Sequence, residues 1–318
     1  MTQKILISGI NGFAGSHLCD YILSNQEPLK IYGTIRRRSN NENIQHITEK
    51  LTLVECDFRD SHSVDNVITE IKPDKIFHLA AQSFVPTSWK IPTETFESNV
   101  IGTLNLLEAV KNAKINPVIQ IACSSEEYGL VYNNELPIKE TNQLRPLSPY
   151  AVSKVAQDLL GWQYHKSYGM KIIRTRAFNH SGERRPADFV DSAFAKQIVM
   201  IENEKQSLLL YGNLDAIRDF TDVKDVVRAY WIVTEHPELY GQAVNICSGH
   251  GWKIENVLNE LIRNAKCPIE KVYDKEKSRP SDVPVLLGDN SLISKYWKPE
   301  FNYKETLLNM LNYWRKRI

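Results

Sequence analysis

The chain has 318 residues and a formal charge of +1 near neutral pH, from 39 Lys and Arg against 38 Asp and Glu, which argues against nucleic acid or a membrane surface as its partner. No apolar run reaches membrane-spanning length, and the short N-terminal run is followed too soon by glycine for a signal peptide. The five cysteines form no Cys-x-x-Cys pair, which predicts reduced thiols in a cytoplasmic protein rather than a disulfide frame or a metal site.

A glycine turn follows the first predicted strand. The apolar run at 4–8 is typical of a strand buried on both faces, and the segment after the turn predicts a helix over about 13–23. Glycines allow the backbone to approach a pyrophosphate closely, and a helix N-terminus attracts its negative charge. The pattern predicts a dinucleotide-binding turn; a plain strand–helix turn is the alternative. Its cofactor-binding residues would be Gly9, Asn11, Gly12, Phe13, Ala14 and Gly15.

Arginines follow the second predicted strand, which covers about 29–35. An acidic residue at this point would bind a ribose 2′-hydroxyl and favour NAD, and the sequence has none there. Arg36 and Arg37 could instead hold a 2′-phosphate, because a guanidinium matches phosphate geometry. We therefore predict NADP rather than NAD, with a solvated basic loop as the alternative.

Three more strands are predicted before residue 125, at 51–56, 76–81 and 118–122, with a long helix at about 92–112. Asp57 could accept from an adenine amine beside Phe58, or it could cap the next helix. Small residues after the fourth strand would let the cofactor approach at Leu79, Ala80 and Ala81. Strands that alternate with helices predict an α/β fold with a doubly wound parallel (Rossmann) sheet, whose ligands lie at the carboxyl ends of the strands.

A hydroxyl cluster and a Tyr-x-x-x-Lys motif predict the catalytic centre. Tyr150 and Lys154 are four residues apart on a predicted helix and so share one face. The lysine charge would lower the tyrosine pKa, which would suit Tyr150 as a general base toward a sugar hydroxyl. Ser124, after the fifth strand, could hold the same oxygen. The alternative is an ordinary amphipathic helix with two polar residues facing water.

The pattern changes after this helix. We predict strands at 171–176 and 243–247 and helices at 189–201 and 222–235. Between and after them we predict a polar, turn-rich segment at 178–186, a charged loop at 212–220 and a late loop at 279–284.

Together these motifs resemble the extended short-chain dehydrogenase/reductases that act on nucleotide sugars. Within them the chain is similar to the GDP-mannose 4,6-dehydratases and the related GDP-4-keto-6-deoxymannose reductases, most specifically at 178–180 and 212–216. The resemblance implies a cofactor domain of residues 1–176 and 220–248, and a smaller, interleaved GDP-sugar domain of residues 177–219 and 249–318. It implies substrate-binding roles for Ser83, Ser125, Asn179, Arg184, Val190, Arg218 and Arg279, and no metal.

The reaction stays open at this point. Phe13-Ala14 replaces the Gln-Asp that is usual in the dehydratases, and the overall length and the segment 142–150 look more like the reductases. Arg36 to Ser39 and Glu183-Arg184-Arg185 look like the dehydratases. A 4,6-dehydratase would use Ser124, Glu126, Tyr150 and Lys154, and an NADPH-dependent 4-reductase could dispense with Glu126. An enzyme that does both, or a non-catalytic NADP-sensing module, is also compatible with the fold.

Two helices predict self-association. The segments 92–112 and 150–165 carry more apolar side chains than one buried face needs. The residues concerned are Leu104, Leu107, Val110, Val155, Leu159, Leu160 and Trp162. A two-fold patch is the commonest oligomer solution, so we predict a homodimer, or a homotetramer if the Arg36 to Ser39 loop adds a second interface. The alternative is that these residues pack under loops of their own chain.

Overall fold

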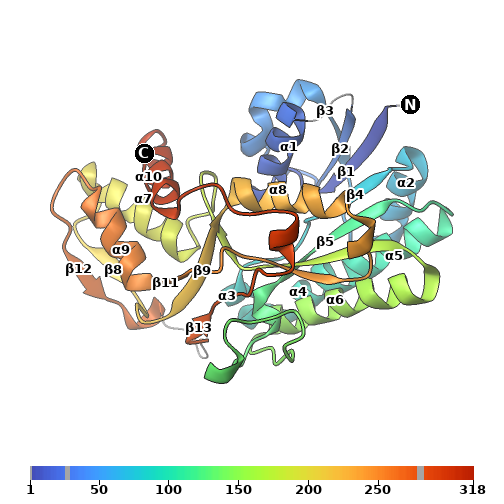
Figure 1. Ribbon diagram of the computed structural model, residues 1–318. Coiled ribbons are helices and arrows are strands. Elements are labelled where there is room, and N and C mark those ends of the chain that lie inside the picture. Colours follow the sequence, from blue (N-terminus) through green and yellow to red (C-terminus); the bar gives the residue numbers. More distant parts are fainter. Residues whose placement is uncertain (1, 26–28, 278–282) are drawn as a thin grey trace.

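The computed structural model describes residues 2–25, 29–277 and 283–318, and it has a larger and a smaller lobe (Figure 1). The larger lobe is built on a seven-stranded sheet in which every neighbouring pair is parallel. In sheet order its strands are β10 Ala243–Ile246, β6 Lys171–Ala177, β5 Val118–Ser124, β4 Lys75–His78, β1 Gln3–Ser8, β2 Leu29–Ile35 and β3 Leu51–Glu55. The strand order reverses between β1 and β4, which places a crevice at their carboxyl ends.

Helices cover both faces of this sheet, as its continuously apolar strands require. One apolar cluster packs α1 and α8 on the sheet through residues such as Leu18 and Val226, and another packs α2 and α5 through residues such as Val67 and Leu106. The helices of this lobe are α1 Phe13–Asn25, α2 Ser61–Ile71, α3 Val85–Lys90, α4 Pro92–Phe96, α5 Gly102–Asn112, α6 Pro149–Tyr168 and α8 Val223–Thr234. The predicted doubly wound α/β fold is confirmed.

The smaller lobe has its own apolar core, formed by α7, α9 and α10. Its helices are α7 Val190–Glu202, α9 Ile254–Arg263 and α10 Tyr303–Arg315. Its strands are β7 Asn179–Ser181, β8 Leu209–Tyr211, β9 Ile217–Asp222, β11 Gly251–Lys253, β12 Lys271–Tyr273 and β13 Val285–Leu286. The chain leaves the large sheet after β6 and returns to it at β10, which pairs with β6. Within the described ranges, none of the helices is both long and apolar enough to cross a membrane.

Two predicted elements differ in the structure. The long helix predicted over 92–112 is present, but a π-helical turn, Glu97–Ile101, divides it into α4 and α5. The turn carries Asn99, which is fully buried and bonds to Gln82 and Ser153 outside the helix. The strand predicted to reach 81 ends at His78, because the N–H groups of Leu79 and Ala80 both donate to Ser8 Oγ at 2.9 Å rather than to a neighbouring strand.

Candidate active site

A cleft of about 1230 Å³ lies at the carboxyl ends of the parallel strands and continues between the two lobes. All four predicted catalytic residues line it: Ser124, Glu126, Tyr150 and Lys154. So do most of the residues predicted to bind cofactor or substrate, namely Gly9, Asn11, Gly12, Phe13, Ala14, Gly15, Arg36, Asp57, Phe58, Leu79, Ala80, Ala81, Ser83, Ser125, Asn179, Val190 and Arg218. The fold thus gathers residues that are far apart in the sequence along one cavity.

Three predicted residues are not placed there. Arg184 has a left-handed backbone, with φ +67°, and its guanidinium pairs with Asp20 on α1 at 2.7 Å, so the prediction that it faces the substrate is corrected. The adjacent Arg185 lines the cleft instead. Arg37 is exposed and is not part of the lining. Arg279 lies outside the described residues.

The glycine turn is shaped for a close backbone approach. Gly9 has φ +66° and accepts a hydrogen bond from the Gly12 N–H at 3.0 Å. A Cβ on Gly15 would lie 2.4 Å from the Gly9 carbonyl oxygen, so only glycine fits there. Asn11 Nδ2 donates to Ser39 Oγ at 3.0 Å and ties the loop after β2 to the turn. With the N-terminus of the 13-residue helix α1 beside it, this turn fits the pyrophosphate of a dinucleotide.

The Asp57 carboxylate pairs with the side chain of Arg59 and does not cap a helix. Arg59 Nη2 lies 2.6 Å from it, and this hydrogen bond lowers the pKa of Asp57. The alternative role as helix cap is wrong, because Asp60 caps α2 by accepting from the His62 N–H at 3.1 Å. Asp57 therefore remains an ionised acceptor at one end of the cleft.

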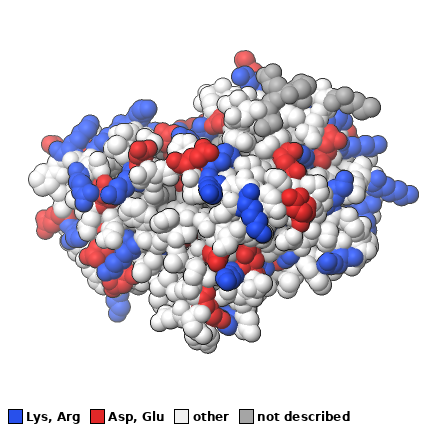
Figure 2. All heavy atoms as spheres, in the orientation of Figure 1, with Lys and Arg blue, Asp and Glu red and all other residues white. Residues whose placement is uncertain are grey.

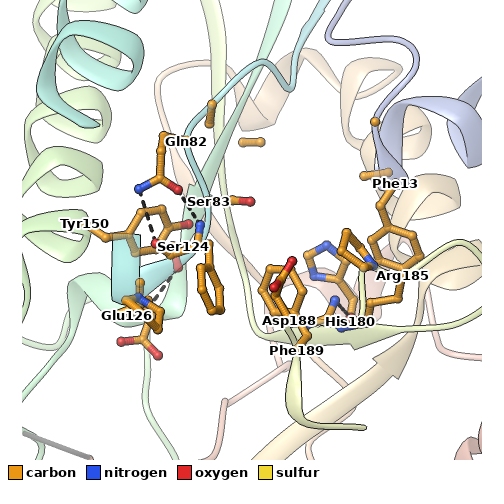
Figure 3. Close-up of a pocket in the computed structure, with 18 of the residues that line it drawn as sticks. Phe13, Gln82, Ser83, Ser124, Glu126, Tyr150, His180, Arg185, Asp188 and Phe189 are labelled. Carbon is orange, nitrogen blue, oxygen red and sulfur yellow. Dashed lines mark hydrogen bonds between the residues drawn. The ribbon is translucent and has the colours of Figure 1, made fainter. Parts of the chain in front are cut away.

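Ser124 stands where β5 turns into a short 3-10 helix. Its Oγ accepts from the Glu126 N–H at 3.2 Å, and its own N–H donates to Glu127 Oε1 at 2.8 Å. Glu127 is fully buried beside Arg176, whose Nε lies 3.2 Å from its Oε2. This turn fixes the Ser124 hydroxyl and presents Glu126 on the same side of the cleft as Tyr150 (Figure 3).

Tyr150 and Lys154 both lie on the buried face of α6. Lys154 Nζ donates to the Ala122 carbonyl oxygen at 2.7 Å and to Gln157 Oε1 at 2.8 Å, and it lies 5.9 Å from the centre of the Tyr150 ring. Burial raises the pKa of Tyr150, although a hydrogen bond with Ser124 opposes the shift. Burial also lowers the pKa of Lys154. The predicted lowering of the Tyr150 pKa by Lys154 is therefore wrong for this structure, since burial of the phenol dominates.

The opposite wall comes from the smaller lobe and the start of α1 (Figure 3). Phe13 stacks on His180, with ring centres 5.9 Å apart and planes within 6°. The Arg185 guanidinium lies 4.2 Å from the centre of the Phe189 ring, and its Nε lies 3.3 Å from Asp191 Oδ1. Burial lowers the pKa of His180 to about 4. Sequence reasoning missed Arg185 and Phe189, although a Pro after paired arginines marked the turn that presents them.

The far end of the cleft combines apolar and cationic side chains. Phe194, Ala216 and Ile254 supply apolar surface. Arg218 is buried on β9, and its Nη1 donates to the Ile217 carbonyl oxygen at 2.9 Å. An apolar pocket with a few convergent polar groups is the usual form of a small-molecule site.

Comparisons with known proteins agree with this geometry. A family model described as GDP-mannose 4,6 dehydratase matches residues 6–310. The chain is 32% identical to the GDP-6-deoxy-D-mannose reductase of Pseudomonas aeruginosa, over 100% of this chain and 99% of that protein. It is 31% identical to a GDP-mannose 4,6-dehydratase of Vibrio cholerae, over 98% and 93% of the two chains.

Solved structures also match over nearly the whole chain. The structure of RMD from Pseudomonas aeruginosa complexed with NADPH superposes with a TM-score of 0.86, at 31% identity and with 100% of both chains covered. A UDP-glucose 4-epimerase from Thermus thermophilus in complex with NAD superposes with a TM-score of 0.89, at 25% identity, over 99% of this chain and 100% of that chain.

Proposed function

Because the chain belongs to the GDP-mannose 4,6-dehydratase family, we propose that it is an NADP-dependent 4,6-dehydratase of a GDP-linked hexose such as GDP-mannose. The product would be a GDP-4-keto-6-deoxy sugar. The observation that carries this proposal is the position of Glu126, whose N–H donates to Ser124 Oγ and which lines the cleft together with Tyr150. A reductase has no step that needs this carboxylate.

The proposed chemistry assigns each side chain one proton or one oxygen. Tyr150 takes the 4-hydroxyl proton while Ser124 holds that oxygen. The ketone formed at C4 acidifies the C5 proton, which Glu126 removes and passes to the 6-hydroxyl, and this group leaves as water. A proton equivalent to the one that Tyr150 took returns to C5, so the sequence balances to the loss of one water.

NADP is the proposed cofactor, held by the glycine turn and by Asp57, Phe58 and the segment Leu79 to Ala81. When bound, it would take hydride from C4 and return it to C6 in the dehydratase, or give hydride to C4 in the reductase. The preference for NADP over NAD rests on Arg36, which lines the cleft directly after β2, where an acidic residue would favour NAD. A guanidinium can pair bidentately with a 2′-phosphate.

The sugar nucleotide is proposed to span the two lobes. Arg218, Asn179 and Arg279 would hold the diphosphate and base, and Ser83, Ser125 and Val190 would line the path to the catalytic centre. The division into a cofactor domain of residues 1–176 and 220–248 and a substrate domain of the remainder is part of the same proposal.

A 4-reductase is the second candidate, alone or combined with dehydration. It is favoured by the full-length likeness to the Pseudomonas reductase. In this reaction Tyr150 would donate its proton to the C4 oxygen rather than take one. A non-catalytic NADP sensor is disfavoured, because such a module needs no Ser124, Tyr150 and Lys154 set.

We also propose a homodimer through α5 and α6, and a tetramer if the Arg36 to Ser39 loop contributes. Leu159 and Trp162 on α6 are 51% and 45% exposed, although Leu107 and Val110 are fully buried in their own chain, so the free apolar surface is smaller than predicted.

The free cysteines support a cytoplasmic location. On the face shown in Figure 2, basic and acidic side chains are interspersed, as suits a small-molecule enzyme.

The function is tested by incubating the enzyme with GDP-mannose and NADP⁺ without a reductant. A product lighter by one water, with no net change in NADPH, supports the dehydratase. Consumption of NADPH only with a GDP-4-keto-6-deoxy sugar supports the reductase, and turnover of neither substrate contradicts both.

A further inference from the structure

An aromatic contact joins the two lobes across the cleft. Phe84 follows β4 in the larger lobe, and Phe189 stands directly before α7 in the smaller one. Their ring centres are 5.8 Å apart with planes at 70°, an edge-to-face arrangement, and both residues line the cleft. Such a pair prefers this geometry because the positive edge of one ring meets the negative face of the other.

Phe189 is held from the smaller lobe. The Arg185 guanidinium lies 4.2 Å from its ring centre, and Arg185 is itself buried beside Asp191. The Phe189 N–H donates to the Pro186 carbonyl oxygen at 3.2 Å. The Phe189 ring therefore contacts Arg185 of its own lobe and Phe84 of the other lobe.

Phe84 is held by the side chain of Gln82. The Phe84 N–H donates to Gln82 Oε1 at 2.6 Å, and Gln82 Nε2 donates to the Phe84 carbonyl oxygen at 3.2 Å. The backbone of Gln82 is clamped in turn by Asn99, whose Oδ1 accepts from its N–H at 2.8 Å and whose Nδ2 donates to its carbonyl oxygen at 3.0 Å. Gln82 thus fixes Phe84 with both ends of its amide.

The same buried asparagine also supports the catalytic tyrosine. Asn99 Nδ2 donates to Ser153 Oγ at 2.9 Å, and the Ser153 hydroxyl donates to the Tyr150 carbonyl oxygen at 2.7 Å. One continuous hydrogen-bond network therefore sets both Tyr150 and Phe84. The backbone of Phe84 and the backbone of Tyr150 are therefore tied to the same buried asparagine.

We propose that the hexose of the sugar nucleotide packs against the Phe84–Phe189 pair, and that Gln82 is the positioning residue of Phe84. This inference rests on the proposed function, in which C4 of the hexose meets Tyr150 and the diphosphate points to Arg218. Both rings line the same cleft as these two residues. The C–H face of a hexose is apolar and suits an aromatic wall. The wall also keeps bulk water from the carbons that react.

The test measures the binding of GDP-mannose and of GDP to the full-length protein by calorimetry. NADPH is present in place of NADP⁺, because the proposed enzyme would convert GDP-mannose if NADP⁺ were bound. Phe84→Ala should weaken GDP-mannose binding by about five- to tenfold, since one aromatic contact is lost, and should leave GDP binding within about twofold. Gln82→Ala should show the same selective loss. Phe301→Ala removes a ring that is 43% exposed and outside the cleft lining, so it is the matched control and should change neither affinity.

If thermal melting shows that Phe84→Ala does not fold, Phe84→Leu replaces it in the test, because leucine keeps an apolar side chain without the ring. We expect Phe84→Leu to weaken GDP-mannose binding by about threefold. Equal weakening of GDP-mannose and GDP, or no tighter binding of GDP-mannose than of GDP by the unaltered protein, overturns the inference. A loss in the Phe84 variants but not in Gln82→Ala overturns the positioning role. An unaltered protein that binds neither ligand contradicts the proposed function itself, and that outcome is separate from the others.

Discussion

Lys154 Nζ donates a hydrogen bond to the carbonyl oxygen of Ala122, 2.7 Å away. Ala122 lies on β5 two residues before Ser124, and Lys154 lies on α6 one helical turn after Tyr150. The bond therefore ties the strand that carries Ser124 to the helix that carries Tyr150, the two residues proposed to act on the substrate oxygen. Lysine acts here first as a tether between two elements, and its charge is directed at a carbonyl rather than at the phenol.

Lys154→Met should lower kcat by about 10²- to 10⁴-fold, because it removes the hydrogen bond that positions the proposed catalytic residues Ser124 and Tyr150 relative to each other. The binding of NADP⁺, measured by fluorescence titration, should also weaken. Lys171→Met, at the start of β6 and outside the cleft lining, is the control and should leave both quantities unchanged. Near-normal kcat in Lys154→Met would contradict the assigned role.

Glu126→Gln should separate the two candidate reactions. The amide keeps the size of the side chain but cannot remove the C5 proton, so dehydration of GDP-mannose should fall by about 10²- to 10⁴-fold. Reduction of a GDP-4-keto-6-deoxy sugar should stay within about threefold, because Tyr150 supplies its proton. Glu94→Gln, which alters another carboxylate of the cleft lining, serves as the control. Equal loss of both reactions would show that Glu126 has a structural role.

Much of the fold was predictable because its signals are local. The apolar runs mark buried parallel strands, and the turn from Gly9 to Gly15 and the pair Tyr150 and Lys154 each depend on spacing within a few residues. Parallel strands bring their carboxyl ends to one edge, so motifs that follow separate strands meet there whatever the sequence between them.

Other features depend on contacts that no local pattern records. Arg184 and Arg185 are adjacent and chemically identical, but the backbone is left-handed at Arg184. Arg184 pairs with Asp20, whereas Arg185 lines the cleft. The contact of Phe84 with Phe189 forms between lobes. In the π-helical turn, buried Asn99 bonds to Gln82 and Ser153 outside its helix, and helical periodicity does not anticipate such contacts.

Arg36→Ala should weaken NADP⁺ binding by about tenfold, the effect of losing one charge-assisted phosphate contact, and leave NAD⁺ binding unchanged. Arg37→Ala is the matched control, because Arg37 is exposed and outside the cleft lining, and its NADP⁺ affinity should stay near that of the unaltered protein. Calorimetric titration with both cofactors measures this. Equal effects of Arg36→Ala on NADP⁺ and NAD⁺ would refute a 2′-phosphate contact.

Acid should destabilise the protein through buried histidines. Burial lowers the pKa of His17 and of His180 to about 4. Between pH 6.5 and 4 these two histidines bind protons in the unfolded chain but not in the folded chain. The free energy of unfolding is therefore highest above pH 6.5 and falls as the pH falls through this range. The loss is about 1.4 kcal/mol per pH unit for each histidine. Urea unfolding at about pH 7, 6 and 5 measures this loss. His17→Asn should reduce the slope of the unfolding free energy against pH by the contribution of about one proton. An unchanged slope would contradict the role given to His17.

Helix α6 carries an exposed apolar stripe. Val152, Val155, Leu159 and Trp162 follow helical spacing, and three of them are 41%, 51% and 45% exposed, in the order Val152, Leu159 and Trp162. Helix α5 lies beside α6 on the same side of the sheet (Figure 1). A patch of this kind on a two-fold axis buries itself against its own copy, because each helix then meets an identical apolar surface.

Light scattering at micromolar concentration should therefore give about twice the 36.6 kDa of one chain. Leu159→Glu should return the protein to the monomer mass, because it buries a charge at the centre of the proposed interface without a partner. Leu308→Glu is the control: Leu308 is also exposed, at 38%, but lies on α10 in the other lobe, so the dimer should persist. A monomer mass for the unaltered protein with NADP⁺ bound would contradict the proposed dimer. A dimer mass for Leu159→Glu would show that the interface does not include this part of α6.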